Sequence, residues 1–200
     1  MSRLSPSWLL LGVSLVLAGC QTRAPHALPT EVPAGLRRRE GETYAQVRAY
    51  YGVPILQKSF FWDGNGETDE FGPGGHIFHH ITDSVAIGAG ANLSTWLIPG
   101  ADAYSAEVEA VLRVYPEATC PVFLDFSGGY QQSTEPVPPG GTEWNYTFGF
   151  GPGVEFPMGK GSSLMLAANY HHMSNALGRD NERNPSQNEA RLWIGYAWNF

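Results

Sequence analysis

The chain of 200 residues has little cysteine and little positive charge, and each shortage excludes a class of protein. It contains two cysteines, Cys20 and Cys120, and the first lies in a segment that we expect to be processed. Cys120 would then be the single remaining thiol, so no intramolecular disulfide is expected. Twelve Lys and Arg stand against 19 Asp and Glu, a formal net charge of −7. Because nucleic-acid binding needs clustered basic residues, we expect no nucleic-acid partner.

Long hydrophobic runs are also missing, apart from one at the N-terminus. This run, residues 8–17, is too short to span a bilayer as a helix and is typical of an export signal. It ends in Leu-Ala-Gly-Cys at residues 17–20, which resembles the lipobox of bacterial lipoproteins. We therefore predict a signal peptide over residues 1–19, lipidation of Cys20 and, with Gln21 next, sorting to the outer membrane. An ordinary signal peptide that happens to contain a cysteine is the alternative.

The segment after the signal peptide is predicted to be a tether. Residues 22–42 are rich in proline and charge and show no periodicity. We therefore interpret residues 20–52 as the lipidated N-terminus and a periplasmic tether. Residues 53–200 remain as the folded body, which is long enough for one domain with a substantial buried surface.

From residue 53 onward, apolar and polar residues alternate with a period of two, which indicates β-strands. In residues 144–156 the even positions are mostly aromatic, whereas the odd positions carry glycine and polar residues. Residues 104–115 place valine, leucine and alanine on one face, opposite Glu107, Glu109 and Arg113. We expect strands over residues 55–62, 75–82, 85–97, 104–115, 120–130, 143–156, 161–174 and 189–200.

The polar face of these strands bears on whether the apolar face meets a soluble core or lipid. Burial of the charged side chains on this face would be costly in a dry core, whereas such side chains are typical of the lumen of a small membrane barrel. They are Glu107, Glu109, Arg113, Asp125 and Glu155. Several segments are long enough to cross a bilayer, and their even number suits closure. The aromatic C-terminus ending in Phe resembles the assembly signature of outer-membrane barrels. We predict an all-β fold, an eight-stranded antiparallel transmembrane β-barrel with long outer loops and short periplasmic turns. A soluble, lipocalin-like barrel is the alternative.

The stretch His-His-Met-Ser-Asn, residues 171–175, carries the candidate catalytic residues. His172 and Ser174 share the strand face that is predicted to point outward, near the outer rim of the barrel. Residues i and i+2 on one face lie about 6.6 Å apart, so the imidazole and the hydroxyl can lean into hydrogen-bond reach. This spacing suits a general base and a nucleophile, but also fits two plain surface residues at a strand end. His171 is expected to point inward as an interior polar group.

A serine nucleophile needs a third group that orients its histidine, and the neighbouring strand lies about 4.8 Å away. Counted back from Phe200, the outward face of the last strand falls on Asn188, whereas Glu189 points into the barrel. A β-bulge at the start of the strand would turn Glu189 outward instead. Asn188 can fix a histidine tautomer but cannot balance an imidazolium charge. The sequence leaves both residues as candidates.

The same region resembles a known family, the lipid A 3-O-deacylases, which are outer-membrane acyloxyacyl hydrolases. The resemblance implies an eight-stranded barrel with a serine-hydrolase site on its lipid-facing surface, where a 3-O-linked hydroxyacyl chain is removed from lipid A. Ser174 would attack the ester, His172 would act as general base and then acid, and Asn188 or Glu189 would complete the triad. Asn175, with the backbone amides after it, would stabilise the oxyanion. The matching residues are His172, Met173, Ser174, Asn175 and Ala176, followed by Asn184, Pro185 and the terminal Phe200.

No cofactor or metal ion is expected from the sequence. His76, His79 and His80 lie close together, but residues 79 and 80 point to opposite faces of a strand. The expected partners are lipid A or lipopolysaccharide as substrate and the outer membrane itself, and a homodimer is left open. The alternative function is a non-catalytic barrel lipoprotein, structural or adhesive, in which His172 and Ser174 have no catalytic role.

Overall fold

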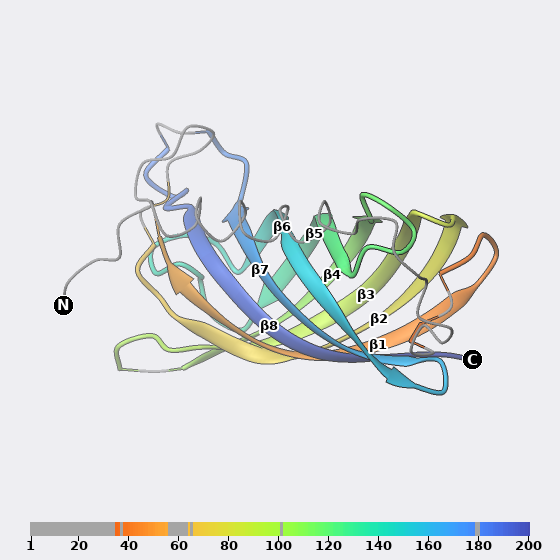
Figure 1. The fold of residues 1–200 in the computed structure, drawn as a ribbon. Helices are drawn as coiled ribbons and strands as arrows, with labels where there is room; N and C mark the ends of the chain where they lie inside the picture. The colour runs from red at the N-terminus through yellow and green to blue at the C-terminus, as the bar shows by residue number, and fades with distance from the viewer. Residues whose placement is uncertain (1–34, 37, 56–63, 65, 101, 179–180) are drawn as a thin grey trace.

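A computed structural model describes residues 35–36, 38–55, 64, 66–100, 102–178 and 181–200. Within these residues, antiparallel strands close into a barrel in which each strand pairs with the next and the last pairs with the first (Figure 1). The predicted fold class is confirmed. The strands are β1 (Thr43–Pro54), β2 (Glu70–Thr82), β3 (Val85–Trp96), β4 (Ala103–Val114), β5 (Val122–Ser133), β6 (Trp144–Gly159), β7 (Ser162–Ser174) and β8 (Gln187–Asn199).

The barrel has an apolar outside and a polar inside. Val108 and Leu93 are 59% and 58% exposed on the outer face, whereas Glu107 and Arg113 are buried in the lumen. An apolar outer band around a charged interior is the pattern of a transmembrane barrel and not of the soluble, lipocalin-like alternative. The described part of the chain contains no helix that is long and apolar enough to cross a membrane.

The connections between strands differ in length at the two ends of the barrel. Three connections join strands at one end, which we call the short-turn end. They are residues 83–84, 115–121 and 160–161. The C-terminus lies at this end, where the Asn199 amide donates to the Gly161 carbonyl at 2.9 Å (Figure 1). Three of the four connections at the other end, which we call the loop-rich end, are longer than any at the short-turn end, in line with the prediction from the sequence. The four connections are residues 55–69, 97–102, 134–143 and 175–186.

The first strand corrects the prediction from the sequence. β1 begins at Thr43 rather than near residue 55, so the boundary between tether and barrel at residue 53 is wrong by ten residues. Residues 56–62 of the expected strand lie outside the described part of the chain. β1 escapes hydropathy analysis because long amphipathic side chains face the lumen and small residues share the lipid face. The buried lumen side chains are Tyr44, Gln46, Arg48 and Tyr50.

Residues 38–42, together with Leu36, close the short-turn end instead of forming a free tether. Leu36 is buried, and its amide donates to Ser163 Oγ at 3.2 Å. The Arg38 guanidinium lies over the Tyr115 ring, 4.4 Å from its centroid, and donates to the Cys120 carbonyl at 2.6 Å. Cys120 itself is disulfide-bonded, so the expectation of a lone thiol is wrong. The predicted signal peptide and the lipidation site lie outside the described residues.

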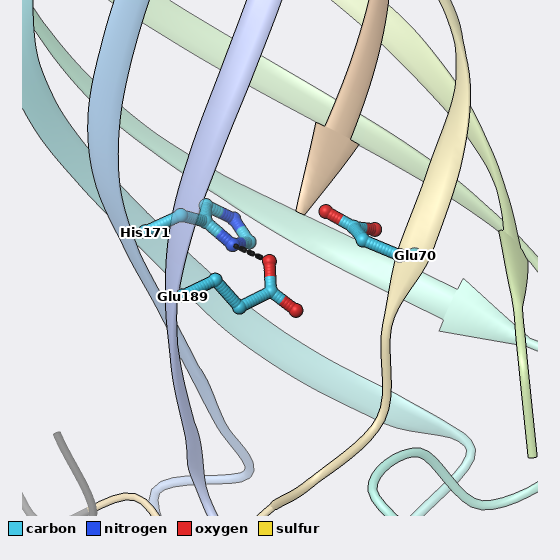
Figure 2. Close-up of side chains that lie close together, drawn as sticks. All are labelled: Glu70, His171 and Glu189. Atoms are coloured by element: carbon cyan, nitrogen blue, oxygen red, sulfur yellow. Dashed lines mark hydrogen bonds and ion pairs between the residues drawn. The ribbon is translucent and has the colours of Figure 1, made fainter. Parts of the chain in front are cut away.

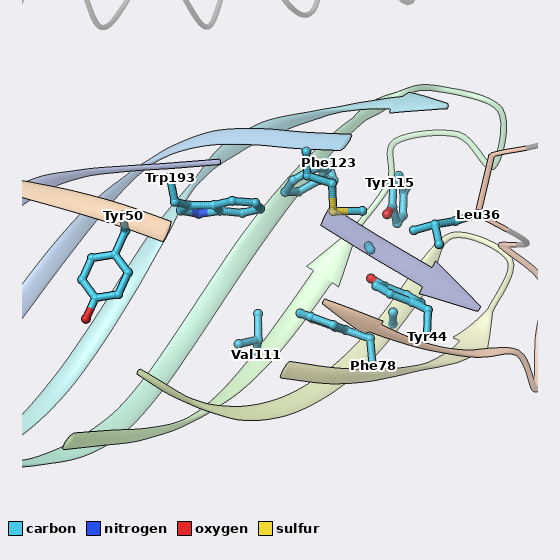
Figure 3. Packing of buried hydrophobic residues seen from close by; sticks show 11 residues of the cluster. Leu36, Tyr44, Tyr50, Phe78, Val111, Tyr115, Phe123 and Trp193 are labelled. Atoms are coloured by element: carbon cyan, nitrogen blue, oxygen red, sulfur yellow. The ribbon is translucent and has the colours of Figure 1, made fainter. Parts of the chain in front are cut away.

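An apolar cluster fills the lumen toward the short-turn end (Figure 3). Arg113 crosses this cluster, with its guanidinium carbon 4.4 Å from the centre of the Phe78 ring and 4.1 Å from that of Phe123. Two parallel hydrogen bonds of 2.7 Å join it to Asp125. Such a bidentate pair, sandwiched by aromatic faces, satisfies a charge that would otherwise be costly to bury. The labelled members of the cluster are Leu36, Tyr44, Tyr50, Phe78, Val111, Tyr115, Phe123 and Trp193.

Candidate functional site

His172 and Ser174 lie on the outward face of β7, at the loop-rich end. They continue the parity of Leu166, which is 39% exposed on the barrel surface. Across the sheet His172 is paired with Phe148 and Ser174 with Tyr146. The His172 and Phe148 rings are 5.4 Å apart. The structure therefore places the two predicted residues on one side of the wall.

Asn188 is the residue that contacts the His172 imidazole. His172 Nδ1 and Asn188 Oδ1 are 2.7 Å apart, and the Tyr170 hydroxyl donates to the same oxygen at 2.6 Å. An amide oxygen only accepts, so the bond requires a hydrogen on Nδ1. In the neutral ring this leaves Nε2 as the basic nitrogen, which is the tautomer that a general base needs.

Glu189 lies on the opposite side of the wall. The β7–β8 register runs without a shift and pairs His172 with Asn188 and His171 with Glu189. No bulge turns Glu189 outward in these described strands, and its carboxylate is fully buried in the lumen. It accepts from His171 Nδ1 at 3.2 Å and from Gln187. Of the two predicted candidates, Asn188 therefore faces His172 and Glu189 does not.

The connection between β1 and β2 covers part of this outward face. A Cβ placed on Gly64 would lie 2.6 Å from the Asn188 amide nitrogen and 2.7 Å from its Nδ2. Asn188 has no exposed surface and His172 is 3% exposed, although both point outward. Ser174 is half-buried. The site is thus sheltered by a loop rather than open to lipid along its whole length.

Asn175, which we expect to stabilise the oxyanion together with the backbone amides after it, holds the β7–β8 loop through its side chain. Its Nδ2 donates to the Arg183 carbonyl at 2.5 Å, and its Oδ1 accepts from the Leu177 amide at 3.2 Å. Its backbone amide donates to Asn184 Oδ1 at 3.1 Å. The Ala176 amide, at a left-handed φ of 57°, makes no hydrogen bond to the described residues. Of the amides around Asn175, that of Ala176 is the one left for an oxyanion.

The inner face of the same strands carries a charged network. His171 Nε2 lies 3.4 Å from Glu107 Oε1, and Arg191 donates to Glu107 at 3.1 Å and to Glu70 at 2.7 Å. Figure 2 shows Glu70, His171 and Glu189 converging from three strands. The expectation that His171 is a hydrogen-bonded interior group is confirmed.

Three residues of these two faces were missed from the sequence. Tyr170 has the same parity as His172 and precedes it by two positions, so its place beside Asn188 could be found by the rule that located Ser174. Glu70 was missed because β2 was expected to begin at residue 75, after the run of glycine and proline. Gln187, whose Oε1 accepts from the Thr68 amide at 3.1 Å, lies at the start of β8, before the predicted strand.

Comparisons with known proteins support the fold. No protein-family model matches the chain, and no curated protein matches it in sequence. Among solved structures it is similar to the outer membrane protein OprG from Pseudomonas aeruginosa, with a TM-score of 0.52 and 11% identity over 82% of this chain and 99% of that one. It is also similar to Neisserial surface protein A (NspA), with a TM-score of 0.55 and 15% identity over 79% and 97% of the two chains. At such identities the likeness concerns the fold alone.

Proposed function

We propose that this outer-membrane β-barrel is a serine ester hydrolase that removes a 3-O-linked hydroxyacyl chain from lipid A. Ser174 is the nucleophile, His172 the general base and acid, and Asn188 the group that orients the imidazole. The observation that carries the proposal is the 2.7 Å contact between His172 Nδ1 and Asn188 Oδ1 on the outward face. A histidine fixed in this tautomer two residues from a serine on the same face suits acyl transfer.

The reaction proceeds in two acyl-transfer steps. His172 Nε2 takes the proton of the Ser174 hydroxyl as Oγ attacks the ester carbonyl, and the imidazolium then protonates the departing sugar oxygen. Water, deprotonated by the same nitrogen, cleaves the acyl-serine and releases the hydroxy fatty acid. The Ala176 amide is the candidate donor to the tetrahedral oxyanion, an effect worth about 3 kcal/mol per donor in enzymes.

Asn188 sets the expected efficiency of this site. An amide holds the tautomer but adds no negative charge beside the imidazolium, which an Asp or Glu would do. The Tyr170 hydroxyl helps because it occupies the same amide oxygen and so opposes a flip of Asn188. We therefore expect a slow hydrolase.

The place of the site supports a lipid substrate. Ser174 ends β7 at the loop-rich end, on the face that carries the apolar outer band. In outer-membrane barrels the longer loops are extracellular, so this depth corresponds to the outer leaflet. Lipopolysaccharide occupies that leaflet, and its acyl esters lie near the boundary between the sugar and the hydrocarbon.

A non-catalytic barrel is the second candidate, and three observations favour it. His172 is 3% exposed, and Gly64 packs on its partner Asn188. No hydrogen bond joins Ser174 Oγ to His172 within the described residues. The orienting residue is an amide rather than a carboxylate. On this view the outward polar residues fix the β7–β8 edge to its loop.

One experiment separates the two candidates. The full chain and its Ser174→Ala variant are expressed in the outer membrane of a Gram-negative host, and lipid A is analysed by mass spectrometry. Ser127→Ala, which changes a lumen serine on β5, is the matched control. The hydrolase predicts loss of one hydroxyacyl chain with the wild type and the control but not with Ser174→Ala. Identical lipid A in all strains would leave the non-catalytic barrel as the function.

A further inference from the structure

Three potential metal ligands meet inside the barrel near its loop-rich end. Glu70 comes from β2, His171 from β7 and Glu189 from β8, and each is at most 2% exposed (Figure 2). One ligand atom from each lies within 4.8 Å of the other two. An imidazole and two carboxylates form a donor set that suits zinc and similar divalent ions.

The charge of this cluster depends on how many protons it holds. The carboxylates of Glu70, Glu107 and Glu189 surround one guanidinium, that of Arg191. The nearby Arg48 supplies no spare positive charge, because it is paired with Glu109. His171 lies between Glu189 and Glu107, so both of its ring nitrogens can carry hydrogen. With His171 protonated in this way and the three carboxylates ionised, one excess negative charge remains. A divalent cation that displaces the Nδ1 proton would bring the cluster to neutrality. Uncompensated charge is costly to bury at this depth.

A free carboxylate oxygen gives a second, independent indication of a ligand. Glu70 Oε1 accepts from Arg191, whereas Glu70 Oε2 is buried and accepts from no donor group of the described residues. The nearby Glu189 carboxylate can approach Glu70 only through a shared proton or a cation. Buried carboxylate oxygens are seldom left unpaired in folded proteins. Oε2 is therefore the oxygen available to a cation.

Gly52 on β1 makes room for the two carboxylates. A Cβ at this position would lie 2.8 Å from Glu70 Cγ and 2.9 Å from Glu189 Oε2. Every other residue type would push the carboxylates away from their present positions. The wall is thus shaped to let both acidic side chains approach one point.

We propose that Glu70, His171 and Glu189 bind one divalent transition-metal ion of the zinc class. The 3.2 Å between His171 Nδ1 and Glu189 Oε2 is close to the edge of a zinc tetrahedron, about 3.3 Å for bonds near 2.0 Å. Metal binding replaces the proton between these two atoms, so the doubly protonated His171 releases its Nδ1 proton on metal uptake and keeps the hydrogen on Nε2. His171 Nε2 then donates to Glu107 Oε1, 3.4 Å away, the outer carboxylate that commonly orients a histidine ligand.

The site would join β2, β7 and β8 from the inside. It does not depend on the proposed hydrolase activity, because its ligands face the lumen whereas His172 and Asn188 face outward. A structural role predicts that bound metal raises the melting temperature, since the ion binds the folded barrel and not the separated strands.

The test uses the full chain without an affinity tag, purified in detergent micelles, stripped with a chelator and titrated with Zn²⁺ in a calorimeter. We expect one Zn²⁺ per chain and a higher melting temperature in its presence. Glu70→Gln and His171→Gln should each weaken binding by more than about tenfold. His76→Gln is the matched control, because His76 is a second buried lumen histidine, 2.8 Å from Glu109. His79→Ala, which removes an exposed histidine, shows whether Zn²⁺ binds at the outer surface instead of in the lumen.

Several results would overturn the proposal. The first is that the wild-type barrel takes up no Zn²⁺. The second is that Glu70→Gln binds Zn²⁺ as tightly as the wild type. The third is that only His79→Ala loses Zn²⁺ binding. A wild type without Zn²⁺ affinity, together with a stabilised Glu70→Gln, would mean that a shared proton balances the carboxylates. If the Glu70 variant does not fold, the Co²⁺-loaded wild type decides: four-coordinate visible bands support the site, and their absence rejects it.

Discussion

His172 and Asn188 pair on the outer face of β7 and β8, one position along from His171 and Glu189, which pair on the inner face. Two adjacent residue pairs of the β7–β8 register thus form two polar contacts, which lie on opposite sides of the barrel wall. Because side chains alternate along a strand, a slip by one residue would exchange the two pairs. The outer pair suits proton transfer to and from a serine, and the inner pair suits charge compensation.

Replacing Asn188 by aspartate tests the role of the amide. A carboxylate at this position would balance the imidazolium that forms when Ser174 loses its proton, so we expect hydrolysis of an ester substrate to accelerate by at least about tenfold. The buried charge beneath Gly64 should lower the free energy of unfolding by about 1–3 kcal/mol. Initial rates and urea unfolding of the same samples measure both effects. A rate as low as that of Ser174→Ala would contradict the assigned role.

Tyr170→Phe removes the second donor to the Asn188 oxygen and keeps the aromatic ring. The amide is then free to turn its NH₂ group toward His172, which favours the wrong tautomer. We expect kcat to fall about tenfold while KM is unchanged, with a loss of about 1 kcal/mol in stability. Steady-state kinetics in mixed micelles separate the two parameters. Equal kcat values for the variant and the wild type would show that the hydroxyl does not position the site.

Gly64→Ala should displace the chain segment that packs on Asn188, the hydrogen-bond partner of His172. The added methyl group would clash with the Asn188 backbone at 2.6 Å, and backbone cannot move aside as a flexible side chain can. We expect diethyl pyrocarbonate to modify His172 several-fold faster in this variant, as measured by peptide mass spectrometry. Gly75→Ala is the control, because a Cβ there meets nothing within 4 Å. An unchanged rate at His172 would mean that Gly64 does not limit access.

Arg113→Met tests the buried ion pair near the short-turn end. Methionine fills part of the space between Phe78 and Phe123 but leaves the Asp125 carboxylate buried without its partner. Breaking such a pair costs about 3–5 kcal/mol, which urea unfolding in micelles measures. Arg113→Met combined with Asp125→Leu should regain most of this loss. A double variant no more stable than the single one would show that packing against the guanidinium, and not charge, holds the cluster.

The sequence predicts those parts of the barrel where the two faces differ strongly. In β6 aromatic residues alternate with glycine and polar residues, so its position and orientation follow from the period of two alone. β1 fails the same analysis because Tyr44 and Tyr50 line the lumen while Ala45 and Ala49 face lipid, which reduces the contrast.

The candidate site shows the same division. Parity counted from Phe200 correctly separates Asn188 from Glu189, since alternation is a local property of the strand. The cover at Gly64 and the use of Asn175 in its own loop depend on how loops pack, for which no periodic pattern exists. Closure of the barrel through β1 brings Glu70 close to His171. A prediction that misses β1 therefore cannot place Glu70 beside His171.

The filled lumen determines from which direction a substrate can arrive. Aromatic rings and Arg113 occupy the short-turn end, and the cavity beside Glu109 and His171 measures about 20 Å³, room for one water molecule. Sugars, peptides and hydrated salts therefore cannot thread through the protein as they do through a porin. A substrate of the proposed hydrolase would therefore reach Ser174 from the plane of the bilayer, along the flank of the barrel, and not through the lumen.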